Sequence, residues 1–583
     1  MAVRKGVGII LGLLGIAVLI SLLGMAAIFF AARGGPAVRD DATLYLQVDG
    51  NLSEIEPGGV VGQFLGAQPT LRSAVDALRK AAADDRVKSV VLQPRGGAPL
   101  WAKAQELRDA IVEFRKSGKP IVAYLEYGAE YEYFLASACD QVYLMPASSL
   151  DLRGLATYEL FLRGALDKVG AYPDMMHIGD YKTAANTFTE TGFTPAHREM
   201  AESLNRDLYA QLVRGIADGR RKSEDEIRTL LDHGPFVAED ALAAGLIDGL
   251  AYEDELDDYA TLGGAKQRVD DEKYREVSLR SVGLDTGPKI AVLYLVGVIS
   301  SGASSFDQAG GAVTGSDTVL EWLRKVRADS SVRAIVLRID SPGGSAIASD
   351  VIWREVTLTR AIKPVVASMG DVAASGGYYV AMPAHAVVAQ PGTLTGSIGV
   401  VMGKFALGGT MEKLGVGVDG VESGAYAGML SPVRPYSEKE RARVMEQMQA
   451  TYDTFVEKVA DARASTPEKI DAIAQGRVWT GRQARELGLV DELGGLWTAI
   501  DIAKQRAKID PGRQVQLEVY PPRRSVFELV ANPFGSGAAA RAAGPLGALF
   551  ADPRAKALES LATRLNLFRS GEPLTLMPNV FVR

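Results

Sequence analysis

Cysteine, histidine and long basic runs are scarce in this sequence. Among its 583 residues there are one cysteine and four histidines. The single cysteine, Cys139, cannot form a disulfide within the chain, and no cysteine–histidine group has the spacing of a zinc site. The composition therefore predicts neither a metal nor another cofactor. It also predicts that any hydrolytic mechanism works without a histidine base.

Charge of one sign is not concentrated anywhere. The chain has 64 basic and 71 acidic residues, which gives a net charge of −7. Because no long basic stretch is present, nucleic acid is not an expected partner. A hydrophobic content of 47% excludes a disordered chain, and the length allows several globular domains.

The one long apolar run lies at the N-terminus. Residues 6–32, between Lys5 and Arg33, carry no charge. At 1.5 Å per residue, a helix of this length exceeds the ~30 Å hydrocarbon core of a bilayer. The apolar region of a secretory signal is only about 7–15 residues long. The run therefore predicts an uncleaved transmembrane anchor at residues 6–32, with the rest of the chain on one side of the membrane.

Two long stretches of the chain resemble each other at a spacing of about 245 residues. DDRVKSVVLQPRGG in the first half corresponds to SSVRAIVLRIDSPGG in the second, and AEDALAAGLIDGL corresponds to GRQARELGLVDEL. A unit this long indicates a duplicated domain. The predicted organisation is a first copy at 43–265, a linker at 266–289, a second copy at 290–515 and a tail at 516–583 that belongs to neither copy.

Short apolar runs alternate with amphipathic segments in each copy. This alternation predicts crossover units and a mainly parallel sheet, and hence an α/β fold. The predicted buried strands of the second copy are Ala334–Ile339, Val365–Met369 and Ala386–Ala389. Its predicted helices are Ala348–Arg360, Ser375–Met382 and Glu438–Ala464.

The two copies differ at two chemically reactive positions. Alignment on a shared Lys-Pro pair places Ser375 of ASGGY opposite Tyr131. Alignment on a later segment places Lys182 of GDYK opposite Ala427. Each copy thus lacks the residue that the other retains, which predicts a serine–lysine dyad formed across the two halves.

Such a dyad can carry out nucleophilic catalysis. A serine hydroxyl needs a base to remove its proton, and a lysine can act as that base when burial lowers its pKa. Ser375 opens a predicted helix, so the backbone N–H of Gly376 is a candidate oxyanion donor. The second candidate donor is the N–H of Gly344 in the SPGG motif, which follows a predicted strand.

These motifs together resemble one protease family. SPGG, MGDVAASGGYY, PGTLTGSIGV and the first-half GDYKTAANTF are similar to segments of the SppA signal peptide peptidases, also called protease IV, in their long duplicated form. The resemblance implies tandem ClpP/crotonase-like domains and a serine endopeptidase that degrades cleaved signal peptides and other peptides. It implies Ser375 as the nucleophile, Lys182 as the general base and Ser397 as a hydroxyl that orients the lysine.

The resemblance also implies a location and an assembly. We expect a single-pass protein of the bacterial inner membrane with its soluble body on the periplasmic side, and a homo-oligomer, as a tetramer. One segment departs from the family: YKTAANT follows Gly179 and Asp180, where the family reads close to YKSA-x-EP. The lysine itself is kept.

Two other functions are compatible with parts of the sequence. One is a non-catalytic, membrane-anchored scaffold that binds peptides, and the other is a crotonase-type acyl-CoA enzyme. The Ser375–Lys182 pair disfavours both. Asp371 suggests a triad, but no histidine stands between it and the serine. Cys139 and His385 are interpreted as structural, and the tail from residue 525 is predicted to be dispensable for hydrolysis of short peptides.

Overall fold

The computed structural model describes most of the chain. The described residues are 20, 21, 24, 38–55, 69–97, 100–256, 267–307, 311–522, 572–577 and 581–582. The predicted anchor at residues 6–32 lies outside this part, apart from helical Ile20, Ser21 and Gly24. Within the described ranges, no helix has both the length and the apolar character required to cross a bilayer.

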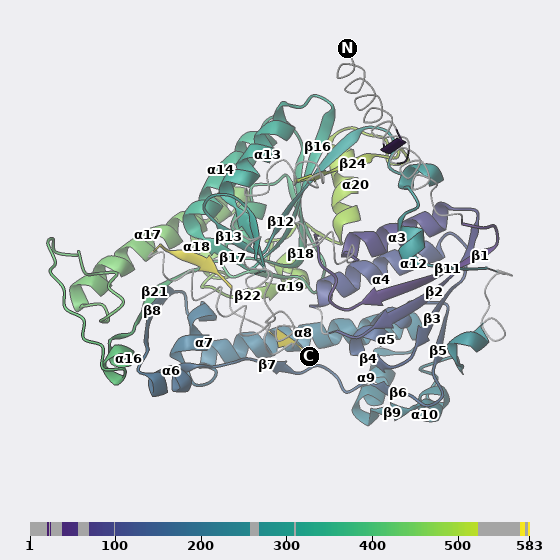
Figure 1. Ribbon diagram of the computed structural model, residues 1–583, viewed down its shortest axis with the longest axis horizontal. Coiled ribbons are helices and arrows are strands. Elements are labelled where there is room, and N and C mark those ends of the chain that lie inside the picture. Colours follow the sequence, from purple (N-terminus) through teal and green to yellow (C-terminus); the bar gives the residue numbers. More distant parts are fainter. Residues whose placement is uncertain are drawn as a thin grey trace, which may run out of the picture.

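A parallel sheet organises the first half of the chain. Its strand order is β10-β5-β3-β2-β1-β11, and all of its pairs are parallel. Beside this sheet, in the purple and blue part of the molecule, lie helices α3, α4, α5 and α8 (Figure 1). The strands are β1 (Ala42–Asp49), β2 (Val87–Arg95), β3 (Ile121–Leu125), β5 (Gln141–Leu144), β10 (Gly249–Leu250) and β11 (Gln267–Asp270). The helices are α3 (Leu71–Ala83), α4 (Trp101–Arg115), α5 (Glu130–Ala136) and α8 (Pro195–Arg220).

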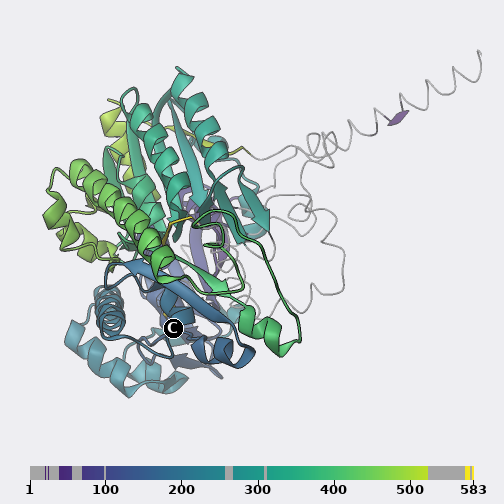
Figure 2. The ribbon, with the colours of Figure 1, turned by 90° about the vertical axis from the view of Figure 1, so that its left-hand side faces the viewer.

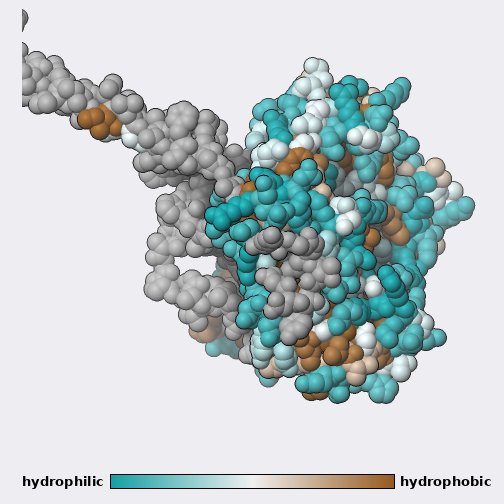
Figure 3. All heavy atoms as spheres, turned by 90° about the vertical axis from the view of Figure 1, so that its right-hand side faces the viewer, coloured by the Kyte–Doolittle hydropathy of each residue, from teal (hydrophilic) through white to brown (hydrophobic). Residues whose placement is uncertain are grey.

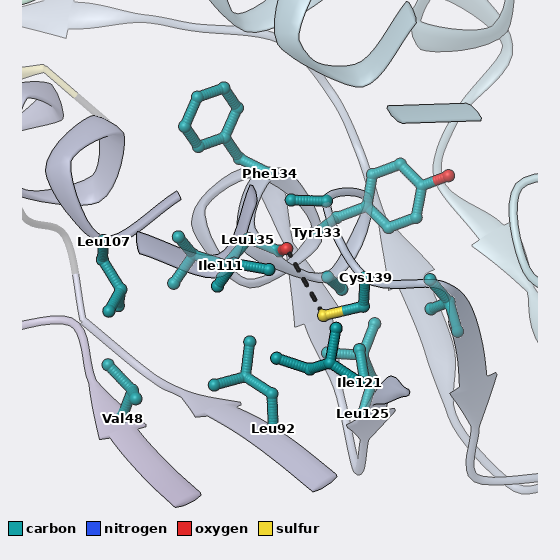
Figure 4. Packing of buried hydrophobic residues seen from close by; sticks show 14 of the residues in the cluster. Val48, Leu92, Leu107, Ile111, Ile121, Leu125, Tyr133, Phe134, Leu135 and Cys139 are labelled. Atoms are coloured by element: carbon teal, nitrogen blue, oxygen red, sulfur yellow. Dashed lines mark hydrogen bonds between the residues drawn. The ribbon is translucent and has the colours of Figure 1, made fainter. Parts of the chain in front are cut away.

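Cys139 lies in the core of this half, as the sequence suggests. Figure 4 shows its sulfur among apolar side chains that include Ile121 and Leu125, 4.0 Å from the carbonyl oxygen of Leu135. Burial raises the pKa of the Cys139 thiol, so the thiolate needed for reactivity is disfavoured. The side chain therefore serves as a small apolar core group.

A second sheet repeats the pattern in the second half. Its main path is β22-β20-β18-β16-β12-β24; β19 pairs with β18, and β23 pairs with β19. The strands are β12 (Lys289–Val296), β16 (Val332–Ser341), β18 (Val365–Ala374), β19 (Ala386–Ala389), β20 (Leu394–Gly396), β22 (Val478–Thr480), β23 (Glu492–Leu493) and β24 (Gln516–Tyr520). The helices include α13 (Ser316–Ala328), α14 (Ala346–Arg360), α15 (Gly376–Ala381), α17 (Glu438–Ala462), α19 (Gly481–Glu486) and α20 (Leu496–Arg506). In Figure 2 this teal and green half is stacked above the blue half.

The predicted elements of the second copy are present with shifted ends. β19 has the predicted bounds, and β18 runs five residues further, to Ala374. The segment 266–289, expected as a linker, opens with β11, which extends the first sheet, and continues into α12 (Asp271–Arg275) with buried Tyr274. The first five residues of the expected tail form β24, which pairs with β12 in the second sheet. β11, α12 and β24 are each too short to show the hydrophobic periodicity that predicts a strand or a helix.

A third sheet contains strands from both halves. Its order is β14-β15-β13-β17-β25-β21-β8. The strands are β8 (Tyr172–Ile178), β13 (Val298–Ser300), β14 (Ser305–Asp307), β15 (Gly311–Gly315), β17 (Gly343–Ser345), β21 (Val400–Ala406) and β25 (Leu574–Leu576). First-half β8 pairs antiparallel with second-half β21 along its whole length. This pairing carries the chain that follows β8 into the second half.

Buried charges also join the two halves. Arg338 of β16 is 1% exposed, and its guanidinium lies 2.6 Å from Glu54 and 2.8 Å from Glu106, both in the first half. Close by, first-half Lys103 bridges Asp340 at 2.8 Å and Asp371 at 3.2 Å. The outer surface differs from this interior: the face shown in Figure 3 is largely hydrophilic, with apolar residues in small groups. The two halves thus share an internal ionic cluster, in which loss of one partner would leave a buried charge uncompensated.

Removing the central cation of this cluster should destabilise the protein. Arg338→Met leaves Glu54 and Glu106 buried without their partner, which we expect to cost about 3–5 kcal/mol and to lower the melting temperature. Lys116→Met is the control, because it breaks an ion pair with Glu113 in which both side chains are more than 60% exposed. That change should cost less than about 1 kcal/mol. Equal melting temperatures for the two variants would contradict a structural role of the cluster.

Candidate active site

The lysine of the predicted dyad is delivered by the strand pairing between the halves. Ile178, the last residue of β8, is opposite Val400, the first residue of β21. The chain then turns, with the N–H of Lys182 donating to the carbonyl of Gly179 at 3.1 Å, and enters a short 3₁₀ helix at Thr183–Ala185. Lys182 is a residue of the first half, and it is 0% exposed.

The serine stands at the end of a buried strand. β18 ends at Ala374, and α15 begins at Gly376, so Ser375 occupies the corner between them. Its φ of 56° and ψ of −114° lie in a region that residues other than glycine rarely adopt. Such strain is found where a side chain must be presented in one direction. Ser397, after β20, also has a positive φ, of 50°.

The structure brings Lys182, Ser375 and Ser397 together within one chain. Lys182 Nζ lies 2.7 Å from Ser375 Oγ. It lies 2.8 Å from the carbonyl oxygen of Ser397 and 3.1 Å from its Oγ. All three side chains are 0% exposed. The two halves of the duplication therefore each contribute to a single site.

Electrostatics at the site favour a neutral lysine. Burial lowers the pKa of Lys182 well below its usual value, and burial is the dominant cause. Asp371, which suggests a triad, is engaged elsewhere: its carboxylate accepts from the N–H of Lys103 at 2.9 Å and faces the Lys103 amine. Burial raises the pKa of Asp371 to about 7, although Lys103 acts in the opposite direction.

Glycine backbone lies against the serine corner. Gly343 has φ of 97°, and a Cβ there would be 2.7 Å from the backbone nitrogen of Gly376. Gly344 has φ of 153°, and a Cβ there would be 2.1 Å from the carbonyl oxygen of Ile299. A side chain at either position would collide with backbone, so the SPGG motif is required for this close approach. Gly376 is the first residue of α15, where a backbone N–H has no partner within the helix.

The residue of the first half that corresponds to Ser375 differs from Tyr131, the residue predicted by the alignment on the Lys-Pro pair. Tyr133 donates to the carbonyl of Leu246 at 2.5 Å, and Tyr378 makes the equivalent bond to Leu489 at 2.9 Å. Matching these tyrosines places Ser375 opposite Glu130, so the prediction of Tyr131 is wrong by one residue. An ungapped alignment misplaces this residue because the segment between the Lys-Pro pair and the matched tyrosine is one residue longer in the second half.

Sequence reasoning missed a turn that holds the lysine loop. The carbonyl of Gln475 accepts from the N–H of Tyr181 at 2.9 Å, and the carbonyl of Arg477 accepts from the N–H of Ser397 at 2.7 Å. Between them, Gly476 has φ of 78°, and a Cβ there would lie 2.4 Å from the backbone nitrogen of Lys182. In the sequence this turn is marked by Gly476 alone, and the role of Gly476 comes from its contact with Lys182, which lies far away in the chain.

The remaining candidate residues have structural partners. Nδ1 of His385 accepts from the N–H of Val365 at 3.1 Å, in agreement with the structural interpretation. Across the ranges that the structure describes, no group of three or more histidine, cysteine, aspartate or glutamate side chains could hold a metal ion.

Comparison with known proteins agrees with this architecture. The model of peptidase family S49 matches residues 113–264 and 357–510, one region in each half. The chain is 37% identical to the chloroplastic serine protease SPPA of Arabidopsis thaliana, over 77% of this chain and 68% of that protein. It is 34% identical to Protease 4 of Salmonella typhi, over 81% and 78%, and 30% identical to Protease 4 of Haemophilus influenzae, over 82% of each.

The chain belongs to peptidase family S49. Two family regions within one chain make it a duplicated protease of the SppA type, as the sequence motifs predict. It is a serine-type endopeptidase with a mixed α/β fold. The family therefore favours the peptidase over both a non-catalytic scaffold and an acyl-CoA enzyme.

Substitution at Gly476 tests whether the turn positions the lysine. Gly476→Ala places a methyl group against the Lys182 backbone, and we expect peptidase kcat/KM to fall by at least about 10-fold, since a misplacement of 1 Å can cost about 100-fold. Gly488→Ala is the matched control: its φ is 76°, and a Cβ there meets nothing within 4 Å. Both variants carry similar backbone strain, so equal activities would contradict the positioning role.

Proposed function

We propose that this protein is a membrane-anchored serine endopeptidase in which Ser375 is the nucleophile and Lys182 is the general base. We propose cleaved signal peptides and other peptides as its substrates. The observation that carries this proposal is the 2.7 Å contact between Lys182 Nζ and Ser375 Oγ in a fully buried setting. A buried amine without its proton is a base of suitable strength at neutral pH.

The surroundings of the amine support this assignment of roles. A neutral lysine has two N–H bonds and one lone pair. The carbonyl oxygen and hydroxyl of Ser397 lie 2.8 Å and 3.1 Å from Nζ and can accept both N–H bonds. The lone pair then faces Ser375, whose hydroxyl donates to it. Ser397 thus orients the base through two of its oxygens.

The proposed reaction proceeds in two stages. Ser375 Oγ attacks the scissile carbonyl carbon while its proton passes to Lys182 Nζ, and Lys182 then protonates the departing amine. Water, deprotonated by Lys182 Nζ, next attacks the acyl-enzyme, and Lys182 returns that proton to Ser375 Oγ as the ester bond breaks. The oxyanion formed in each stage would accept from the N–H groups of Gly376 and Gly344.

Location, fold family and assembly are part of the same proposal. The uncharged run at residues 6–32 supports a single membrane-spanning helix in contact with the lipid bilayer. The family resemblance supports tandem ClpP/crotonase-like domains, a place in the bacterial inner membrane with a periplasmic body, and a homo-oligomer. A relative from Enterococcus faecium with 36% identity over 191 residues is described as a putative signal peptide peptidase, which supports the substrate class.

Three variants test the dyad. Ser375→Ala should lower kcat by at least about 10³-fold, because it removes the nucleophile. Lys182→Arg should be as inactive, since a guanidinium stays protonated and cannot accept the serine proton. The double variant Lys182→Ala/Ser375→Ala should be scarcely worse than either single change, because the two residues act as one unit.

A lysine with similar burial provides the control. Lys80 is 4% exposed, and its amine donates to the backbone carbonyl of Tyr274 at 2.8 Å, outside the site. Lys80→Met should lower stability but leave the turnover of each folded molecule near that of the wild type. Near-normal turnover of Lys182→Ala on a peptide substrate would sink the proposal.

A further inference from the structure

The C-terminal segment of the chain forms a strand beside the proposed site. β25 (Leu574–Leu576) is inserted between β17 and β21 in the third sheet, where the larger yellow arrow lies in Figure 1, near the label β21. It is antiparallel to β17, with Gly343 opposite Leu576 and Gly344 opposite Thr575. The N–H of Met577 donates to the carbonyl of Pro342 at 2.8 Å. The segment is therefore bound by the SPGG motif that is proposed to stabilise the oxyanion.

Contacts of this strand reach the residues on both sides of the serine. Thr575 Oγ1 donates to the carbonyl of Gly344 at 3.3 Å and would be 2.9 Å from a Cβ placed on Gly376. The Met577 side chain packs in the same apolar cluster as Ala374. Gly376 and Ala374 flank Ser375 directly in the sequence.

The side chains of the segment are buried in two apolar clusters. Leu574, Thr575, Leu576 and Met577 are 0%, 0%, 1% and 4% exposed. Leu574 and Leu576 pack with the residues that follow the lysine, namely Ala184, Ala185 and Phe188, and with Val401. The pocket around Met577 is lined by Met200, Leu204, Val372, Ala374, Leu394 and Val478. Residues from both halves thus contribute to the pockets.

Without this strand, the sheet would have a gap of one strand. β17 and β21 would each present an unpaired edge, separated by the width of one extended peptide and floored by apolar pockets. Open strand edges of this kind bind extended peptides by strand addition, with main-chain bonds for affinity and pockets for selectivity. A peptide bound there would run past Ser375 in the direction that the C-terminal segment follows.

We propose that residues 572–577 occupy the substrate groove of this peptidase and compete with substrate for it. The inference rests on the proposed function, and it extends that function to a substrate class. The groove takes an extended, apolar peptide, with an unbranched apolar side chain in the pocket that holds Met577. A tethered segment has an effective concentration that can reach the millimolar range, so a free substrate must displace it.

Kinetics of a truncated protein test the competition. A protein that ends at residue 571 should show an apparent KM at least about 10-fold lower for a fluorogenic apolar peptide, with kcat within about twofold. The full-length variant Met577→Asp should show the same shift, because a carboxylate is disfavoured in the apolar pocket. Val421→Asp, at a side chain that is 99% exposed, is the control and should change neither constant.

Binding provides a second readout that does not require catalysis. A fluorescein-labelled peptide with the sequence EPLTLM should bind to the truncated protein carrying Ser375→Ala, and it should not bind to the full-length Ser375→Ala protein. If no form hydrolyses peptides, the proposed function fails, and this binding result still decides the inference. An unchanged KM in both tail variants, a loss of fold on truncation, or no binding of the labelled peptide would each overturn it.

Discussion

Both halves of the chain enclose the amine of Lys182, and this burial favours its uncharged form. Lys182 comes from the first half, yet its partners Ser375 and Ser397 belong to the second, and none of the three is exposed. Protonation would place a cation in a site where burial is the dominant influence on its pKa. Enclosure therefore sets the basicity on which the proposed chemistry depends.

Backbone pairing between the halves holds the lysine loop in this buried position. Antiparallel pairing of β8 with β21 carries the lysine loop across, and the turn at Gln475–Arg477 holds it from the other side. A buried cluster around Arg338 adds charge pairing between the halves at a distance from the amine. The contact between Lys182 and Ser375 therefore needs both halves, because each half contributes only one of the two residues.

Much of the site could be predicted because the repeat allows a comparison within one sequence. The strand and helix around the serine, β18 and α15, have a clear apolar pattern, and the unequal positions point to Ser375 and Lys182. The sequence places Tyr131 opposite Ser375, whereas the structure places Glu130 there. The second half has one extra residue before the matched tyrosine, and only the equivalent hydrogen bonds of Tyr133 and Tyr378 reveal it. Gly476 and β25 could not be predicted, since their roles come from contacts with residues far away in the sequence.

The most direct test of a neutral Lys182 is the pH dependence of Ser375 phosphonylation by a fluorophosphonate probe. The second-order rate of labelling should rise with pH in proportion to the unprotonated amine, and it should level off well below the pKa of about 10.4 of an ordinary lysine. The sign follows from the mechanism, because only the deprotonated form accepts the serine proton. A rate that continues to rise to about pH 10, as expected of an ordinary lysine, would contradict the account.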